Sequence, residues 1–293
     1  MPDPTTSSPP AEPRRVRLGH SPDADDAFMF YGIATGRVAD PEFDLVEVVE
    51  DIESLNRRAL KGELEITAIS FHAYSHIADR YLLMGCGASM GKGYGPTVVS
   101  HGPIPDRKSV SVRAAVPGEL TTAYLLLRLF APAWETRTVP FDKILDQVET
   151  GKVDVGVVIH EGQLYYEKQR LKKVADLGEW WGKETGLPVP LGGNVVRRDI
   201  PEPRAQRLQE LLRDSIRMAQ EHRQEALDFA LPFARGLDRD LTSRFIDMYV
   251  NDLTLDCGPE GREAIRELLR RGHEAGVIPR LVRPDFLPEP GRR

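Results

Sequence analysis

The sequence predicts an α/β protein with two lobes and a ligand cleft between them. Short apolar segments rich in β-branched residues alternate with helix-like segments from residue 16 to about residue 177, a pattern typical of sheets covered by helices. The chain after about residue 198 is almost wholly helical. Four of the predicted strands end in hydroxyl, carboxylate or histidine residues. Open α/β sheets bind their ligands at the carboxyl ends of strands, so these strand ends predict a shared ligand site.

The predicted strands and helices follow one another in a regular order. The short length and β-branched content of the apolar segments favour strands, and the near-continuous apolarity of residues 153–159 favours a strand covered on both faces, as in a parallel sheet. Pro203 marks a helix start in the C-terminal part. Strands are expected at residues 16–20, 65–69, 81–86, 96–100, 111–116, 153–159 and 194–197, and helices at residues 27–35, 71–80, 121–130 and 142–150.

The strand at residues 153–159 is the most informative because it is followed by His160 and Glu161. A histidine at the carboxyl end of a strand can act as a base near neutral pH, since its unperturbed pKa is about 6.5. The alternative is a histidine that caps the strand or hydrogen-bonds a neighbouring loop. Glu161 is left outside the predicted site, because adjacent residues on an extended segment tend to point apart.

Three other strand ends carry polar residues at the start of a helix. Residues 21–26 follow the first strand, Ser70 follows the second, and Thr121 and Thr122 open the helix after residue 118. One interpretation is that each residue only caps its helix, a role that stabilises a protein by about 1 kcal/mol. Helix N-termini also attract anions, so several of them facing one cleft suit a carboxylated ligand.

Two crossings, at residues 102–108 and 191–198, divide the predicted chain into lobes. The larger α/β lobe comprises residues 16–105 and 195–293, including the helical C-terminal part, and the smaller α/β lobe comprises residues 106–194. Residues 1–15 are rich in Pro, Ser and Thr and are expected to form a disordered tail.

Composition argues against several classes of protein. The 293 residues carry a formal net charge of -6 and no long basic block, so nucleic acid is not an expected partner. No segment approaches the roughly 20 apolar residues of a membrane span, and the amino terminus lacks a signal-peptide pattern, so we expect a cytoplasmic protein without membrane association. The two distant cysteines, Cys86 and Cys257, give almost no support to a disulfide framework or a cysteine-based zinc site.

Three further motifs have a structural explanation that we prefer. The glycine-rich residues 91–96 lead into a strand rather than the helix that a phosphate-binding loop requires, so we expect a turn or lobe connector. The acidic residues Asp23, Asp25 and Asp26 have a spacing that suits helix capping better than metal binding. Trp180 and Trp181 offer large rings to an aromatic substrate, but packing between lobes is the default for such residues.

Several separated motifs, in order along nearly the whole folded chain, resemble the 1,4-dihydroxy-6-naphthoate synthases, the MqnD branch of the MqnA/MqnD family of the futalosine route to menaquinone. The motifs are Ser21-Pro22-Asp23-Ala24-Asp25-Asp26-Ala27-Phe28-Met29-Phe30-Tyr31, Ile69-Ser70, Pro117-Gly118 with Thr121-Thr122-Ala123-Tyr124, Ile159-His160-Glu161, Asp176-Leu177-Gly178-Glu179-Trp180-Trp181, and Thr185-Gly186-Leu187-Pro188-Val189-Pro190-Leu191-Gly192.

The resemblance implies a periplasmic-binding-protein-like fold of type II that is used as an enzyme. It implies a lyase that converts cyclic dehypoxanthinyl futalosine, a small carboxylated aromatic substrate, into 1,4-dihydroxy-6-naphthoate without a metal or an organic cofactor. The family's histidine base corresponds to His160. Its substrate-binding positions correspond to Asp26, Ala68, Ile69, Ser70, Thr121 and Thr122.

This chain departs from the family pattern at two places. Ala68 stands where family members often have lysine, and Ala24-Asp25-Asp26 stands where they have Pro-Asn-Asp. Two alternative functions therefore stay open: a solute-binding protein for a small carboxylate, and the sibling chorismate dehydratase. The oligomeric state is expected to be a monomer or a homodimer.

Overall fold

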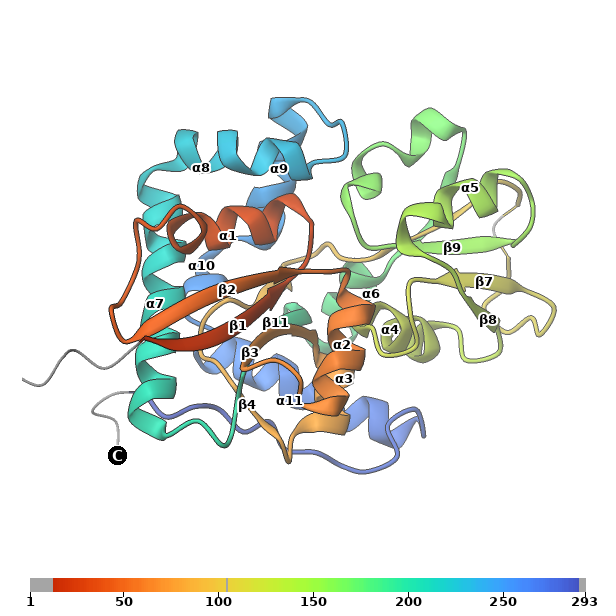
Figure 1. Cartoon of the computed structure of the whole chain (residues 1–293). Helices are drawn as coiled ribbons and strands as arrows, with labels where there is room; N and C mark the ends of the chain where they lie inside the picture. Colours follow the sequence, from red (N-terminus) through yellow and green to blue (C-terminus); the bar gives the residue numbers. More distant parts are fainter. Residues whose placement is uncertain (1–12, 104, 290–293) are drawn as a thin grey trace, which may run out of the picture.

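The computed structural model describes residues 13–103 and 105–289, and shows two β-sheets, each with helices packed around it (Figure 1). The first sheet has the strand order β2-β1-β3-β11-β4, with β5 also paired to β11, and the second has the order β10-β6-β9-β7-β8. The strands of the first sheet are β1 (Arg14–His20), β2 (Phe43–Val49), β3 (Ile66–Ser70), β4 (Tyr81–Leu83), β5 (Ser89–Gly91) and β11 (Val189–Arg197). Those of the second are β6 (Thr97–Ser100), β7 (Arg113–Val116), β8 (Glu135–Thr138), β9 (Val155–Val158) and β10 (Lys172–Asp176).

The helices divide between the two sheets. Those that follow strands of the two sheets are α1 (Ala24–Ala34), α2 (Ile52–Lys61), α3 (Phe71–Ile77), α4 (Thr122–Phe130), α5 (Ile144–Glu149) and α6 (Leu177–Thr185), with the short 3₁₀ turns η1 (Phe141–Lys143), η2 (Glu161–Leu164) and η3 (Tyr166–Gln169). The helical C-terminal part contains α7 (Glu202–Glu221), α8 (Arg223–Ala230), η4 (Leu231–Phe233), α9 (Arg239–Tyr249), α10 (Asp252–Leu255) and α11 (Gly258–Glu274). Figure 1 shows α7, α8 and α9 on the side of the first sheet.

Both sheets mix parallel and antiparallel pairs. In the first sheet β1 is parallel to β2 and β3, whereas β11 runs antiparallel to β3, with Gly192 opposite Ser70. In the second sheet β9 is parallel to β7 but antiparallel to β6. All four residues of β9 are buried, as the apolar run predicted, although only one of its two neighbours is parallel.

The chain changes sheet at slightly earlier positions than the predicted lobe boundaries. β6 (Thr97–Ser100) already belongs to the second sheet, and β11 returns to the first sheet at Val189. We call the part built on the first sheet, with the C-terminal helices, the large lobe, and the part built on the second sheet the small lobe. Residues 1–12 of the predicted tail lie outside the described residues, whereas Arg14 and Arg15 already form the start of β1.

The hydrophobic core explains why α1 follows β1 so closely. Nearly all of α1 is buried, and Phe28 packs with Leu18 of β1 and Leu211 of α7 in one cluster. Burying a side chain of this size contributes about 1.5–3 kcal/mol. A second cluster joins Ile69 of β3 to Val157 of β9, so the two lobes share a core. The packing of Phe28 fixes the start of α1 just beyond the carboxyl end of β1.

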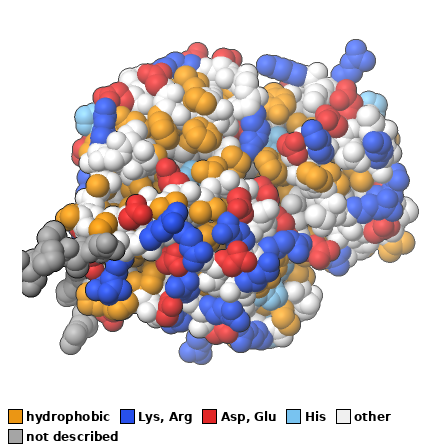
Figure 2. All heavy atoms as spheres, in the orientation of Figure 1, with side chains coloured by type: hydrophobic (Ala, Val, Ile, Leu, Met, Phe, Trp, Pro, Cys, Tyr) orange, Lys and Arg blue, Asp and Glu red, His pale blue; other side chains and the backbone are white. Residues whose placement is uncertain are grey.

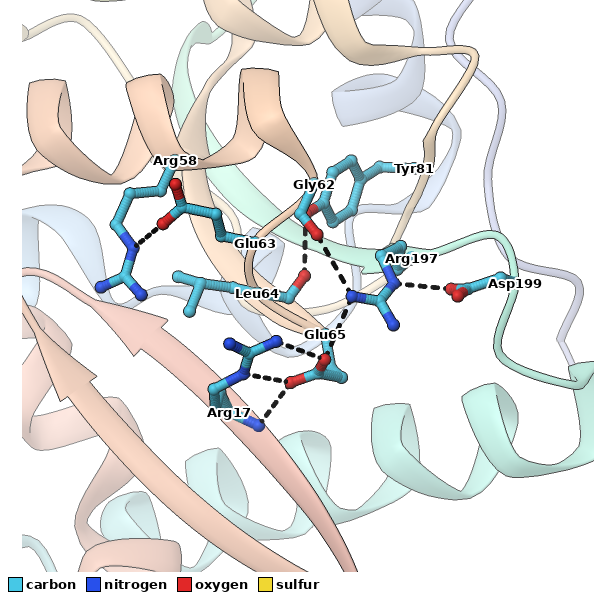
Figure 3. A network of polar contacts seen from close by, with 9 residues as sticks. All are labelled: Arg17, Arg58, Gly62, Glu63, Leu64, Glu65, Tyr81, Arg197 and Asp199. Atoms are coloured by element: carbon cyan, nitrogen blue, oxygen red, sulfur yellow. Dashed lines mark hydrogen bonds and ion pairs between the residues drawn. The ribbon is translucent and has the colours of Figure 1, made fainter.

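A polar network anchors three strands of the large lobe (Figure 3). Both the backbone N–H and the Nε of Arg17 donate to Glu65 Oε2 at 2.9 Å, and Arg197 Nη1 donates to Glu65 Oε1 at 3.1 Å. Burial opposes ionisation of Glu65, but the hydrogen bonds from Arg17 and the charge of Arg197 hold its pKa at about 2. The network therefore ties β1 and β11 to the residue that precedes β3.

Charge is distributed without a single-sign patch on the face drawn in Figure 2, where basic and acidic side chains alternate. Among the described residues, none of the helices combines the length and apolar composition that a membrane span requires.

Candidate functional site

The two lobes enclose a cavity at the carboxyl ends of β1 and β3. It contains about 760 Å³ of space, including its open mouth. All six residues predicted to bind substrate line it, although they come from three separate parts of the sequence: Asp26, Ala68, Ile69, Ser70, Thr121 and Thr122. The predicted convergence of strand ends is therefore present, while substrate binding by these residues stays a prediction.

The hydroxyl groups on the cavity wall are held by hydrogen bonds within the protein. Thr121 caps α4, because its Oγ1 accepts from the Tyr124 N–H at 3.2 Å and donates to the Gly118 carbonyl at 2.7 Å. Thr122 Oγ1 donates to the Leu191 carbonyl at 2.6 Å. Ser70 Oγ accepts from Asn56 at 3.1 Å. These bonds fix the position of each hydroxyl at the cavity wall, so capping and ligand contact are compatible roles for Thr121.

The acidic residues after β1 belong to the cavity wall. Asp26 accepts a hydrogen bond from the Ser21 N–H at 2.7 Å, and Asp23 accepts from the Ser21 hydroxyl at 2.9 Å. Asp25 also lines the cavity, and burial, followed by the charges of Asp26 and Asp23, raises its pKa well above the ordinary value. No side chain of the three caps α1, contrary to the capping expectation for Asp23, the residue at the N-cap. Among the described residues, no group of three or more His, Cys, Asp or Glu side chains is arranged to hold a metal ion.

His160 lies beside the cavity rather than in its wall. The residues around it in sequence, Ile159 and Gln163, do line the cavity, but His160 does not among the residues described. Its Nδ1 accepts from the Gly162 N–H at 2.9 Å, and its Nε2 lies 3.2 Å from the Phe141 carbonyl. A neutral ring with the proton on Nε2 satisfies both contacts. This local bonding corresponds to the alternative stated for a histidine at a strand end.

The environment of His160 keeps its ring uncharged. Only 3% of the residue is exposed. Burial, followed by the charge of Arg235, lowers the pKa of His160 to about 4. Gly162 makes the tight turn around the ring possible, because a Cβ there would lie 2.7 Å from His160 Cε1. The ring is therefore uncharged at neutral pH and, in this buried position, a weaker base than a free imidazole.

Glu161, like His160, is not among the described residues that line the cavity, but its carboxylate reaches the start of α1. It is fully buried, and its Oε1 accepts from the Ala24 N–H at 3.4 Å. Burial, followed by the charge of Asp23, raises its pKa to about 7. Because η2 begins at Glu161, the chain is no longer extended there, so the argument from alternating side-chain directions does not apply, and the exclusion of Glu161 from the site stays a prediction.

Sequence reasoning missed several residues of the cavity wall. Tyr249 of α9 and Gln163 of η2 meet across the cavity, where the tyrosine hydroxyl donates to Gln163 Oε1 at 2.9 Å. Nothing in the helical pattern around Tyr249 distinguishes it from a core residue. Asn194 had a usable signal, since it is a polar residue in an otherwise apolar strand. Its Nδ2 donates to the Gly87 carbonyl at 2.9 Å, whereas its buried Oδ1 has no hydrogen-bond partner among the described residues.

The two tryptophans and the glycine-rich residues 91–96 have the following places in the structure. Trp181 is fully buried and donates to the Pro188 carbonyl at 3.1 Å, and Trp180 packs edge-on against Phe130. Neither tryptophan lines the cavity. The glycine-rich residues 91–96 connect β5 to β6 at the change of sheet.

The cavity wall contains no lysine or arginine side chain among the described residues. Ala68, which stands opposite Asn194 in the pairing of β3 with β11, contributes only a methyl group. An anionic ligand would therefore depend on hydroxyl groups and on the first-turn N–H groups of α4, which intrahelical bonding leaves unpaired.

Solved structures define the class to which this two-lobed architecture belongs. The alkanesulfonate-binding protein SsuA of Xanthomonas axonopodis pv. citri, bound to MOPS, superposes with a TM-score of 0.69 at 14% identity, covering 94% of this chain and 97% of that one. A Candida albicans protein described as having the generic periplasmic binding protein fold gives a TM-score of 0.65 at 14% identity, covering 94% and 98%. The protein therefore has a periplasmic-binding-protein-like fold, as predicted.

Sequence similarity identifies the family within that class. The chain matches the menaquinone biosynthesis family model over residues 16–274. It is 40% identical over 272 residues to a 1,4-dihydroxy-6-naphthoate synthase of Thermus thermophilus, covering 93% of this chain and 99% of the relative. It is 36% identical over 282 residues to the synthase of the same name from Streptomyces coelicolor, covering 94% and 98%. The chain belongs to the menaquinone biosynthesis family, which confirms the resemblance.

Proposed function

We propose that the protein is a 1,4-dihydroxy-6-naphthoate synthase, a carbon-carbon lyase that converts cyclic dehypoxanthinyl futalosine in the cytoplasm. The names of the Thermus and Streptomyces relatives support the product. The observation that carries the proposal for this chain is the convergence of Asp26, Ser70, Thr121 and Thr122 on one cavity. Its walls combine apolar surface for an aromatic ring with hydroxyl groups for a carboxylate.

The substrate carboxylate is held at the start of α4 in this proposal. Thr121 and Thr122 stand at the N-terminus of that helix, where backbone N–H groups and the helix dipole favour an anion. Ser70 faces the same cavity from β3. Neutral donors therefore replace the lysine that family members often have at the position of Ala68. The acidic side chains that also line the cavity are left for the hydroxyl-bearing part of the substrate.

His160 is the general base of the proposed reaction. It removes a substrate proton, and a retro-aldol-like cleavage then releases a three-carbon fragment as the dihydroxynaphthoate ring becomes aromatic. General-base assistance typically contributes 10² to 10⁴ in rate. Support comes from the place of His160 directly after Ile159, a residue of the cavity wall. Because Nδ1 is bonded to Gly162, the ring must turn toward the cavity before it can accept a proton.

The test is turnover by the purified protein of two substrates, each supplied alone. Incubation with cyclic dehypoxanthinyl futalosine should give 1,4-dihydroxy-6-naphthoate, detected by liquid chromatography with mass spectrometry. Incubation with chorismate should leave it unchanged. Conversion of chorismate instead would identify the sibling dehydratase. Turnover of neither compound, together with tight binding of a small carboxylate, would identify a solute-binding protein.

A further inference from the structure

Glu161 belongs to the small lobe, yet its carboxylate contacts the large lobe. Oε1 accepts from the Ala24 N–H, at the start of α1, and Oε2 lies 3.8 Å from Arg235 Nε. Oε2 has no hydrogen-bond partner among the described residues, although the side chain is fully buried. An ionised carboxylate in such a position needs compensation by a nearby cation.

Arg235 supplies that cation from the loop between η4 and α9. Its Nη2 lies 2.6 Å from Asp23 Oδ1. Its guanidinium also lies 4.7 Å from the ring centre of Phe141, a residue of the small lobe. The side chain therefore contacts both lobes at once. Its backbone has φ +50, a left-handed conformation that residues other than glycine seldom adopt and that is often retained at functional positions.

The position of Arg235 matters because its positive charge lies near two carboxylates, those of Asp23 and Glu161. The lobes bring the carboxylates of Asp23 and Glu161 close enough for Asp23 to raise the pKa of Glu161, whereas Arg235 lowers it. Without a cation, two ionised carboxylates would oppose each other in a site shielded from water, where their repulsion is stronger than in bulk solvent. Glu161 directly follows His160 in the chain. The contacts of the Glu161 carboxylate with the large lobe therefore also restrain the backbone position of His160.

We infer that Arg235 is a positioning residue that neutralises Asp23 and Glu161 together, so that the lobes close at neutral pH and the His160-Glu161 segment stays at the cavity. Only the role of His160 as the base rests on the proposed function. The contact itself joins two lobes whether or not the substrate assignment is correct.

The pH dependence of closure has a defined sign. Burial raises the pKa of Glu161 from its ordinary 4.5 to about 7, so closure takes up a proton between these values and is weakened as pH rises toward 7. Arg235 limits this loss, and its removal should make closure fall more steeply with pH. The titratable and charged groups that face Glu161 are Asp23 and Asp25 of the large lobe, Arg235, and His160 and Tyr165 of its own segment.

Distances between the lobes test the inference without any substrate. Spin labels are placed on Thr35→Cys in the large lobe and Glu149→Cys in the small lobe, both exposed, while the native Cys86 and Cys257 are buried. Double electron–electron resonance spectroscopy at pH 8 measures the distance between the two labels. The distribution of this distance should be longer and broader for Arg235→Met than for the parent. Adding Glu161→Gln to Arg235→Met should restore the parent distance, because the opposing charge is gone. Arg239→Met is the matched control, since Arg239 pairs with Asp228 inside the large lobe.

Turnover provides the second readout. Arg235→Met should lower kcat at least tenfold at pH 8 and less at pH 6, and the double variant should recover most of the loss. Arg235→Lys, which keeps the charge, should retain more activity than Arg235→Met and serves as the test if the methionine variant does not fold.

An unchanged distance in Arg235→Met, or a double variant as open as the single one, would overturn the inference. A parent protein that closes normally but lacks turnover would refute the proposed function and leave the inference standing.

Discussion

The backbone N–H of Gly162 donates a hydrogen bond to Nδ1 of His160 at 2.9 Å. This bond occupies the only lone pair that the neutral ring offers, because Nε2 carries the proton toward the Phe141 carbonyl. The histidine ring is thus neutral, with both ring nitrogens bonded within the protein beside the cavity. Proton abstraction requires exchange of the Gly162 contact for one with the substrate, so the η2 turn is part of the proposed chemistry.

His160→Ala is expected to lower kcat by 10² to 10⁴, the range for loss of a general base, while KM changes by only a few fold. Steady-state kinetics with the cyclic futalosine derivative measures both. His101→Ala, at an exposed histidine, is the matched control and should behave like the parent. Circular dichroism should show the same fold for all three proteins. Near-normal kcat in a folded His160→Ala would remove this residue from the base role.

Gly162→Ala tests the turn that holds the ring. The added Cβ would lie 2.7 Å from His160 Cε1, closer than such contacts allow, so the ring must shift. We expect kcat to fall at least tenfold. Gly182→Ala is the control, because its Cβ meets nothing closer than 4.0 Å and alanine favours a helix by up to about 1 kcal/mol over glycine. Equal kcat for the two variants would argue against a role for the Gly162 contact.

Thr121→Ala separates helix capping from substrate binding. Loss of the bond from the Tyr124 N–H should lower the free energy of unfolding by about 1 kcal/mol. KM should rise several fold as well, because Thr121 lines the cavity. Asp238→Ala removes an equivalent cap from α9, outside the cavity wall, and should reduce stability alone. A Thr121→Ala protein that loses stability with unchanged KM would leave Thr121 as a cap only.

His72 should make stability depend on pH. Its two ring nitrogens are buried without hydrogen-bond partners among the described residues, and burial lowers its pKa to about 4. The unfolded chain binds a proton near pH 6.5, so the contribution to stability is complete above that pH and is lost as pH falls toward 4. The loss due to this group at pH 5 is about 2 kcal/mol. Urea unfolding at pH 5 and 7.5 should show a smaller difference for His72→Leu than for the parent. An equal difference would contradict the shifted pKa.

Local patterns were sufficient for much of the fold and of the cavity. Apolar β-branched runs identified β1, β3, β7 and β9 within a few residues, because buried strands need such side chains on both faces. Hydroxyl residues at helix starts led to Thr121 and Ser70, which do share one cavity. The alternation of strands and helices also indicated two sheets, since each sheet must be covered by helices.

Other features depend on contacts between distant segments and leave no local pattern. The strand β2 was missed although five of its seven residues are apolar, and all of them except Phe43 are exposed or half-buried in the folded chain. Arg235 and Tyr249 reach the cavity region only because the C-terminal helices fold back beside α1 and η2. The bond between His160 and Gly162 follows from a turn whose geometry a residue pattern does not specify. Charge coupling between Asp23 and Glu161, 138 positions apart in the sequence, is likewise a property of the closed lobes.

A crystal structure with bound 1,4-dihydroxy-6-naphthoate tests the central claim most directly. The product should lie between the lobes, with its carboxylate at the start of α4 near Thr121 and Thr122, and the His160 ring should be turned from Gly162 toward it. Product bound elsewhere, or a His160 that is still bonded to Gly162 and walled off from the ligand, would contradict the account.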